Sequence, residues 1–301
     1  MVGGGRFVRP VCYMHREPGI VIGSVLFNSH NPHTLMKTTK IGERAVVLYD
    51  SIDELPILRF HAYNKMLLID AGVGSDLNDW DAHIEKAIRF IRKEKPDLAE
   101  KELDNLRQNV YFVQSAISPK YLAFACLVKS VDGTEYNDMT ADGLQKVLDL
   151  FADAPNAELT AQLEAVKKKI DEELQLYFPK LFDDATVKEY YDQLKQRTML
   201  MLDAIIKGDE SDKREEIDHI TTLLLTYTKP KSFSGSDSVE IQYDKQFENM
   251  CLMLSQHLHV NPKSFTVLEY YNAFEYIKEQ AKKASRKSPV SYTHLTLPTI
   301  R

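Results

Sequence analysis

The sequence predicts an all-α protein: a multi-helix bundle with a long antiparallel helical hairpin and at most one short strand or β-hairpin. Three observations predict this class. Apolar residues recur at spacings of three and four along most of the chain, prolines and glycines separate the periodic segments, and alternating apolar and polar residues are rare. The composition, 44% hydrophobic and 27% charged in 301 residues, is that of an ordinary globular protein.

The two ends of the chain do not share this pattern. Residues 1–35 mix Gly, Pro, Asn and His around one short apolar run and lack the cleavage site of a signal peptide, so we expect a non-native or disordered leader, with translation starting at Met36. Residues 285–301 end in PVSYTHLTLPTIR, which resembles a translated sequencing adapter, so we expect an artefactual tail.

Charge bears on the class of partner. The net charge of the chain is −6, and it becomes −11 without the two ends, which carry +2 and +3. A body this acidic repels phosphate backbones, which predicts that nucleic acid is not a partner. No apolar run approaches the length of a membrane span, so we expect no membrane partner either.

Residues 36–155 are predicted to form an N-terminal helical domain. Its elements in order are a strand or an extended arm at 43–49 and helices at about 53–71, 76–95, 96–117, 119–131 and 140–153. Asp132-Gly133 is a turn signal, followed by either a small hairpin or a loop. The second and third helices carry apolar stripes typical of helices that bury one face: Leu77, Trp80, Ile84, Ile88 and Ile91, then Leu103, Leu106, Val110, Val113 and Ile117.

Residues 156–228 are predicted to form the long helical hairpin and one further helix. The first hairpin helix has a stripe over about six turns: Leu159, Leu163, Val166, Ile170, Leu174 and Tyr177. The segment 179–186 breaks the pattern, and a second long helix follows, with Tyr190, Leu194, Met201 and Ile205 on one face. We expect these two helices to pack as an antiparallel pair.

Residues 229–284 are predicted to form a C-terminal helical pair, at about 240–258 and 266–283. The preceding segment, 229–238, contains Pro, Gly and four Ser, which is typical of a linker or a mobile loop. Such a loop would let the pair move relative to the rest of the chain.

The stretch LLIDAGVGSD, residues 67–76, raises the question of a phosphate-binding loop. A Walker A loop needs a Lys after its last Gly, but Ser75 follows Gly74; the dinucleotide fingerprint needs a third Gly, which is missing. We therefore interpret the stretch as a boundary between helices. Gly72 would end one helix in the left-handed conformation, Gly74 would turn the chain, and Ser75 or Asp76 would cap the next helix.

Other candidate chemistry is equally sparse. His257 and His259 are two residues apart, whereas helical metal ligands prefer a spacing of four, so we interpret them as a pair at a helix end. Cys126 and Cys251 lie in apolar surroundings typical of buried thiols, and Cys12 is distant from both, so we expect no disulfides and a reducing compartment. We predict no metal, no cofactor and no catalytic residue, which favours a protein that is not an enzyme.

Aromatic residues give the one candidate binding site. The segment LEYYNAFEYIKE, residues 268–279, has aromatics on more of its surface than one buried stripe needs. One interpretation is a well-buried terminal helix with tyrosine hydroxyls at its edge. The other is a partner-binding face, for which we select Tyr270 and Tyr276, with Tyr271 and Phe274 anchoring the fold. The hairpin of 156–207 is the next candidate surface.

Three stretches of the sequence resemble helical structural or assembly proteins of tailed bacteriophages from gut bacteria: 48–76, 261–280 and 241–262. The first includes a helix start of the form LP-x-x-x-F, here Leu55, Pro56 and Phe60. The resemblance implies a phage tail-assembly chaperone or a minor virion component that binds a phage structural protein, in the cytoplasm of the bacterial host or in the virion. Two alternatives remain: an enzyme whose site combines scattered carboxylates and histidines, and an adaptor or regulator of a host protein. The sequence does not predict the oligomeric state.

Overall fold

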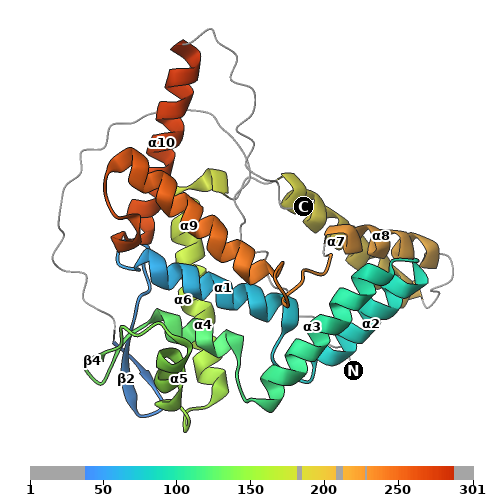
Figure 1. Cartoon of the computed structure of the whole chain (residues 1–301). Helices are drawn as coiled ribbons and strands as arrows, with labels where there is room; N and C mark the ends of the chain where they lie inside the picture. Colours follow the sequence, from blue (N-terminus) through green and yellow to red (C-terminus); the bar gives the residue numbers. More distant parts are fainter. Residues whose placement is uncertain (1–37, 182–184, 208–212, 228, 288–301) are drawn as a thin grey trace.

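The computed structural model describes residues 38–181, 185–207, 213–227 and 229–287. These residues form ten α-helices and one small four-stranded sheet (Figure 1). The mainly helical class is confirmed, whereas the sheet has more strands than the sequence predicts. The predictions for residues 1–35 and 288–301 lie outside the described residues, and the last helix continues to Lys287, past the predicted start of the tail at 285.

The sheet is antiparallel. Its strands are β1 (Thr38–Ile41), β2 (Arg44–Leu48), β3 (Val128–Val131) and β4 (Thr134–Glu135), in the spatial order β1-β2-β3-β4. The strand predicted at 43–49 is confirmed as β2. The turn signal at Asp132-Gly133 forms a hairpin, and both residues have positive φ, 50° and 81°, as the mirror-image turns of hairpins require. The Asp132 carboxylate accepts hydrogen bonds from Arg44 and from the amide of Ala45.

The helix predicted over 119–131 is too long. α4 (Pro119–Leu127) ends at Leu127, and the β-branched residues after it pair with β2 as strand β3. The buried guanidinium of Arg59 stabilises this junction by donating to the carbonyl oxygens of Cys126 and Val128, at 3.1 and 3.0 Å. It thereby satisfies carbonyl groups that the end of a helix leaves without a partner.

The main core lies between the sheet and six helices. Besides α4 these are α1 (Ile57–Val73), α5 (Ala141–Asp149), α6 (Asn156–Tyr177), α9 (Val239–Leu258) and α10 (Val267–Lys287). The stripe predicted on α6 is buried at Leu159, Leu163, Val166, Ile170 and Leu174. The core contains side chains from the predicted segments 36–155, 156–228 and 229–284, so one core spans both predicted boundaries.

A second group of helices projects from this core (Figure 1). It consists of α2 (Asp79–Arg92), α3 (Pro96–Gln114), α7 (Ala185–Lys207) and α8 (Arg214–Tyr227). α2 packs against α3, and α7 packs against α8. Lys93, in the connection between α2 and α3, donates a hydrogen bond to the hydroxyl of Thr222 on α8 and so joins the two pairs.

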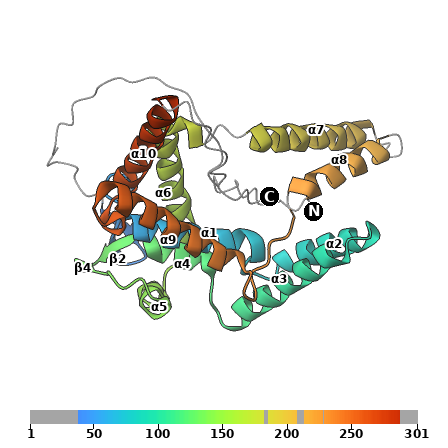
Figure 2. The same ribbon diagram turned by 45° about the horizontal axis from the view of Figure 1, so that its top comes forward.

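The predicted hairpin of 156–177 with 185–207 is not confirmed. α6 uses its apolar stripe in the main core and is followed by a short 3-10 turn, η1 (Pro179–Leu181), while α7 lies beside α8 (Figure 2). The α7–α8 pair is antiparallel, because Asp203 pairs with Lys213 near one end and Tyr190 contacts Tyr227 edge-on at the other. Apolar periodicity showed that both long helices have faces to bury but not which helix each would meet.

The C-terminal pair is confirmed as α9 and α10, joined by a second 3-10 turn, η2 (Pro262–Ser264). The Ser-rich segment before α9 is anchored at two points. Phe233 is buried against Leu68, Ile69 and Val73 of α1, and the Asn105 amide donates to the carbonyl of Lys231 at 3.0 Å. Within the part of the chain that the structure describes, no helix is long and apolar enough to cross a bilayer.

Candidate functional site

The two tyrosines selected as partner-binding residues have different surroundings. Tyr270 has only 4% of its surface exposed and stacks on Phe247, with the ring centroids 6.0 Å apart. Burial raises the pKa of the Tyr270 phenol above its ordinary value. The sequence interpretation placed Tyr270 at the surface, and the structure corrects this: the buried face of α10 includes Val267, Tyr270 and Phe274. Tyr276 is 55% exposed, and its role in binding stays a prediction.

The glycine-containing stretch is confirmed as a boundary between helices, with its details changed. α1 continues through Gly72 to Val73, and the left-handed position belongs to Gly74, whose φ is 70°. Gly72 is required for another reason, since a Cβ there would lie 2.2 Å from the Phe233 ring. The predicted caps Ser75 and Asp76 are wrong: α2 begins at Asp79, whose carboxylate accepts hydrogen bonds from both of their amides.

The residues considered as metal ligands or reactive thiols lie where the sequence placed them. His257 is in the last turn of α9, and His259 follows the helix in the left-handed conformation, with φ of 55°. Cys126 and Cys251 are buried, and burial raises the pKa of both thiols, that of Cys126 to about 12. Among the described residues, no group of three or more His, Cys, Asp or Glu side chains is arranged to hold a metal ion.

A buried histidine–carboxylate pair, not predicted from the sequence, lies between α2 and α3. His83 Nδ1 is 2.8 Å from Glu102 Oε1, and His83 Nε2 is 2.9 Å from the carbonyl oxygen of Val73 at the end of α1. Because a carbonyl oxygen only accepts hydrogen bonds, Nε2 donates to the Val73 oxygen. Nδ1 forms the hydrogen bond with the carboxyl group of Glu102. Both side chains are buried, so this pair holds helices together and is not placed to act on a substrate.

The pair belongs to a larger polar network. The side-chain amide of Asn109 donates to the same Val73 oxygen at 3.0 Å, and Trp80 Nε1 donates to the Asn109 side-chain oxygen at 2.7 Å. Lys86 Nζ lies 3.3 Å from Glu102 Oε1 at the edge of the network. These hydrogen bonds attach the α2–α3 hairpin to the end of α1, together with the apolar contact of Phe112 on α3 with the cluster that contains Val73.

A second histidine pair is half-buried between α1 and α9. The His61 ring lies between Tyr243 and Phe247, with centroid distances of 4.5 and 4.1 Å, and its Nε2 is 2.8 Å from Asp244. Burial lowers the pKa of His61 by more than its hydrogen bond to Asp244 raises it. Lys65 also contacts Asp244, at 3.0 Å. Ring stacking and ion pairing here fasten α9 onto α1.

The apolar stripes of α2 and α3 are not the faces that the fold buries. The residues of α2 with the lowest exposure are His83, Ala87 and Phe90, whereas Ile84, Ile88 and Ile91 are exposed. On α3 the buried residues are Ala99, Glu102, Asn105 and Asn109. Of the predicted stripe, Leu103 is exposed, and the other four residues are only partly buried: Leu106, Val110, Val113 and Ile117. The prediction that these stripes are core faces is corrected: the hairpin turns a mostly polar face to the core and leaves apolar side chains at its surface.

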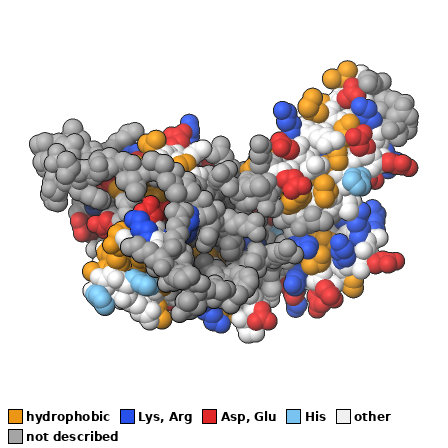
Figure 3. All heavy atoms as spheres, turned by 90° about the horizontal axis from the view of Figure 1, so that it is seen from above, with side chains coloured by type: hydrophobic (Ala, Val, Ile, Leu, Met, Phe, Trp, Pro, Cys, Tyr) orange, Lys and Arg blue, Asp and Glu red, His pale blue; other side chains and the backbone are white. Residues whose placement is uncertain are grey.

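Among the described residues, α7 carries more large exposed apolar side chains than any other helix. Its inner side meets α8, where Ala204 is buried and Gln196 contacts Glu216 at 3.5 Å. Its outer side carries four large exposed apolar residues, which helical periodicity places together: Met199, Leu202, Ile205 and Ile206. Ile206 is 82% exposed. We call these four residues the outer face of α7; Figure 3 shows exposed apolar side chains on the lobe formed by α7 and α8.

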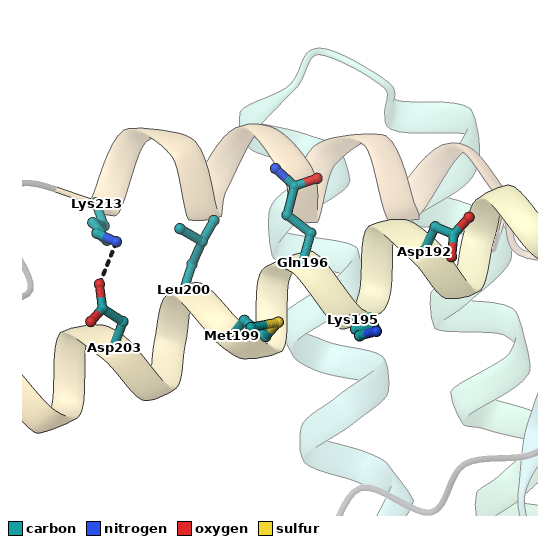
Figure 4. A pocket seen from close by; sticks show the side chains of 7 residues that line it. All are labelled: Asp192, Lys195, Gln196, Met199, Leu200, Asp203 and Lys213. Carbon is teal, nitrogen blue, oxygen red and sulfur yellow. Dashed lines mark hydrogen bonds and ion pairs between the residues drawn. The ribbon is translucent and has the colours of Figure 1, made fainter.

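An open groove of about 510 Å³ runs beside this face, along α7 and the start of α8 (Figure 4). Leu200 and Gln196 point from α7 toward α8, and the Asp203–Lys213 ion pair closes one end. The lining also includes Asp192, Lys195 and Met199. The lining thus combines two acidic and two basic residues with apolar side chains between them.

Comparison of the chain with models of protein families, with curated proteins and with solved structures gives no match in any of the three.

The sequence made the segment 156–207, which contains α7, the next candidate surface, but it did not single out the outer face of α7. The signal was present, because the apolar residues of this segment occupy both sides of the helix: Leu200 and Ala204 on the side of α8, and Met199, Leu202, Ile205 and Ile206 on the other. A helix that is apolar on all sides is normally buried on all sides. Only the structure shows that α8 covers one side and leaves the other exposed.

Proposed function

We propose that this protein is a non-enzymatic protein–protein interaction protein that binds its partner through the outer face of α7. The observation that carries the proposal is the exposure of Met199, Leu202, Ile205 and Ile206 on a helix that already uses its opposite side to contact α8. Single exposed apolar residues are ordinary, whereas several together on one face are typical of binding surfaces.

The composition of this face supports an assembly role. Methionine side chains are flexible and polarizable, so surfaces that contain them adapt to partners of different shape. Met199 lies on the outer face, and Met201 is exposed beside it. An adaptable apolar surface on an acidic, helical protein suits a chaperone that holds an apolar segment of another protein until assembly.

The resemblance of three stretches to phage structural and assembly proteins suggests the partner. We propose a phage structural protein, held by this chain as a tail-assembly chaperone or bound to it as a minor virion component. The bound segment should be an amphipathic helix, because the outer face is one exposed side of a helix and helices pack along such stripes.

Site-specific photo-crosslinking tests the proposal. A photo-reactive amino acid at position 202 is compared with the same residue at Glu215, an exposed position on α8. The protein is co-expressed with the products of the genes that flank its own. We expect a crosslinked product from position 202 and not from 215. Equal crosslinking from both positions, or none from 202, would contradict the proposal; crosslinks to host proteins alone would favour the host-adaptor alternative.

A further inference from the structure

The α2–α3 hairpin has a second apolar surface, separate from the outer face of α7. It is formed by Ile84, Ile88 and Ile91 of α2 and Leu103 of α3, all of which are exposed; we call it the hairpin face. Ile91 is 59% exposed. Beside Leu103, partly buried residues such as Leu106 and Val110 continue the stripe along α3.

These residues share one side of the hairpin for a geometric reason. His83 contacts Glu102 across the interface between the helices, at 2.8 Å. Ile84 and Leu103 each follow a contacting residue by one position, which is a rotation of about 100° around each helix axis. In two antiparallel helices equal rotations from the contact point turn toward the same side of the pair. The two stripes therefore form one two-helix layer with an exposed apolar side.

The charges on α2 indicate what covers this layer. Asp79 and Lys86 have partners within the chain, but the other charges of the helix are acidic in its first half, with Asp81 and Glu85, and basic in its second half, with Arg89 and Arg92. An antiparallel copy of the same helix places the acidic half of one beside the basic half of the other. The hairpin face is thus complementary in charge to itself when related by a two-fold axis, the commonest symmetry of homo-oligomers.

We propose that the hairpin face is a self-association surface, on which the α2–α3 hairpins of two copies of this chain form a four-helix bundle. Two-helix layers with one apolar side bury that side when they pair in this way. Spacings of three and four along both stripes, from Ile84 to Ile91 and from Leu103 to Val110, suit such packing. The hairpin face shares no residue with the outer face of α7.

The test measures self-association of the full chain by sedimentation equilibrium between about 1 and 100 μM, the range in which moderate dimers dissociate. The wild type is expected to form a concentration-dependent dimer, and Ile88→Glu is expected to be monomeric throughout. Leu252→Glu, at an exposed apolar position on α9, is the matched control and should dimerise like the wild type. Ile88 is exposed, so its replacement should leave the thermal midpoint nearly unchanged.

A charge exchange tests the antiparallel arrangement. Asp81→Arg and Arg92→Asp alone should each weaken the dimer about tenfold or more, because close like charges repel. The variant with both changes should recover to within about threefold of the wild-type affinity, because the exchanged pair is again complementary. A wild type that stays monomeric throughout, a dimer that Ile88→Glu leaves intact, or a double variant no better than the singles would overturn the proposal. Crosslinking through α7 is scored separately, so each proposal can fail alone.

Discussion

Replacing His83 with leucine tests whether the polar network holds the α2–α3 hairpin on the core. The imidazole lies between Glu102 and the carbonyl of Val73, at 2.8 and 2.9 Å. Leucine fills a similar space but forms neither hydrogen bond. Among the described residues, Lys86 at 3.3 Å then remains as the ionic partner of the buried carboxylate.

The cost follows from which polar groups remain buried. Leaving a buried charged group without its partner costs about 3–5 kcal/mol. Because Lys86 is partly exposed and stays near the carboxylate, we expect the lower end, about 3 kcal/mol, for His83→Leu. Glu102→Leu leaves one ring nitrogen without its partner and should cost about 1–3 kcal/mol. The double variant should cost less than the sum of the two, because neither group of the pair is left buried alone.

The sequence provides a local probe for this experiment. Trp80 is the single tryptophan of the chain, and it donates to Asn109 within the same network. Urea unfolding followed by tryptophan fluorescence reports on the hairpin, whereas far-ultraviolet circular dichroism reports on all helices. For His83→Leu we expect the fluorescence midpoint to fall below the dichroism midpoint. A destabilisation under about 1 kcal/mol, or costs that simply add in the double variant, would refute the reasoning.

Two further predictions follow from burial. In urea unfolding, Tyr270→Ala should lower the free energy of unfolding by about 3–5 kcal/mol, because it opens a cavity in the core. Tyr276→Ala should lower it by about 0.5 kcal/mol or less. Equal losses would contradict the buried position of Tyr270 and the exposed position of Tyr276. Burial lowers the pKa of His61 below its ordinary 6.5. The unfolded chain therefore binds this proton at a higher pH than the folded chain does. The free energy of unfolding should fall as the pH drops through about 6.5. His61→Phe should flatten that part of the pH profile; an unchanged profile would show that another group is responsible.

Much of the fold was predictable because local signals agree with it. The stripe from Leu159 to Leu174 has one apolar face, and that face is buried. Asp132-Gly133 is suited to a tight turn with positive φ, and it forms one. Helix boundaries set by Pro96 and Pro119 also match, because proline favours the first turn of a helix.

The arrangement of helices was less predictable, because periodicity shows that a helix has an apolar face but not what covers it. On α2 the stripe containing Ile84 and Ile88 looked like the core face, yet the fold buries His83 and Ala87 instead. That choice depends on Glu102 and the end of α1, which lie far apart in sequence and meet only in three dimensions.

The candidate sites were the least predictable part. Aromatic content drew attention to Tyr270, whose burial depends on Phe247 from another helix. Exposure depends on which neighbours are present, so the outer face of α7 became visible only once α8 was placed on its opposite side.

The most direct test of the central claim is the affinity of the partner for the double variant Leu202→Ser, Ile206→Ser, measured by isothermal titration calorimetry with the partner identified by crosslinking. Burying a large aliphatic side chain contributes about 1.5–3 kcal/mol, so losing two should weaken binding about 100-fold or more. Leu176→Ser, Leu252→Ser, which changes exposed leucines on α6 and α9, is the matched control and should bind like the wild type. An affinity that the α7 changes leave within about threefold of the wild type would contradict the proposed binding face.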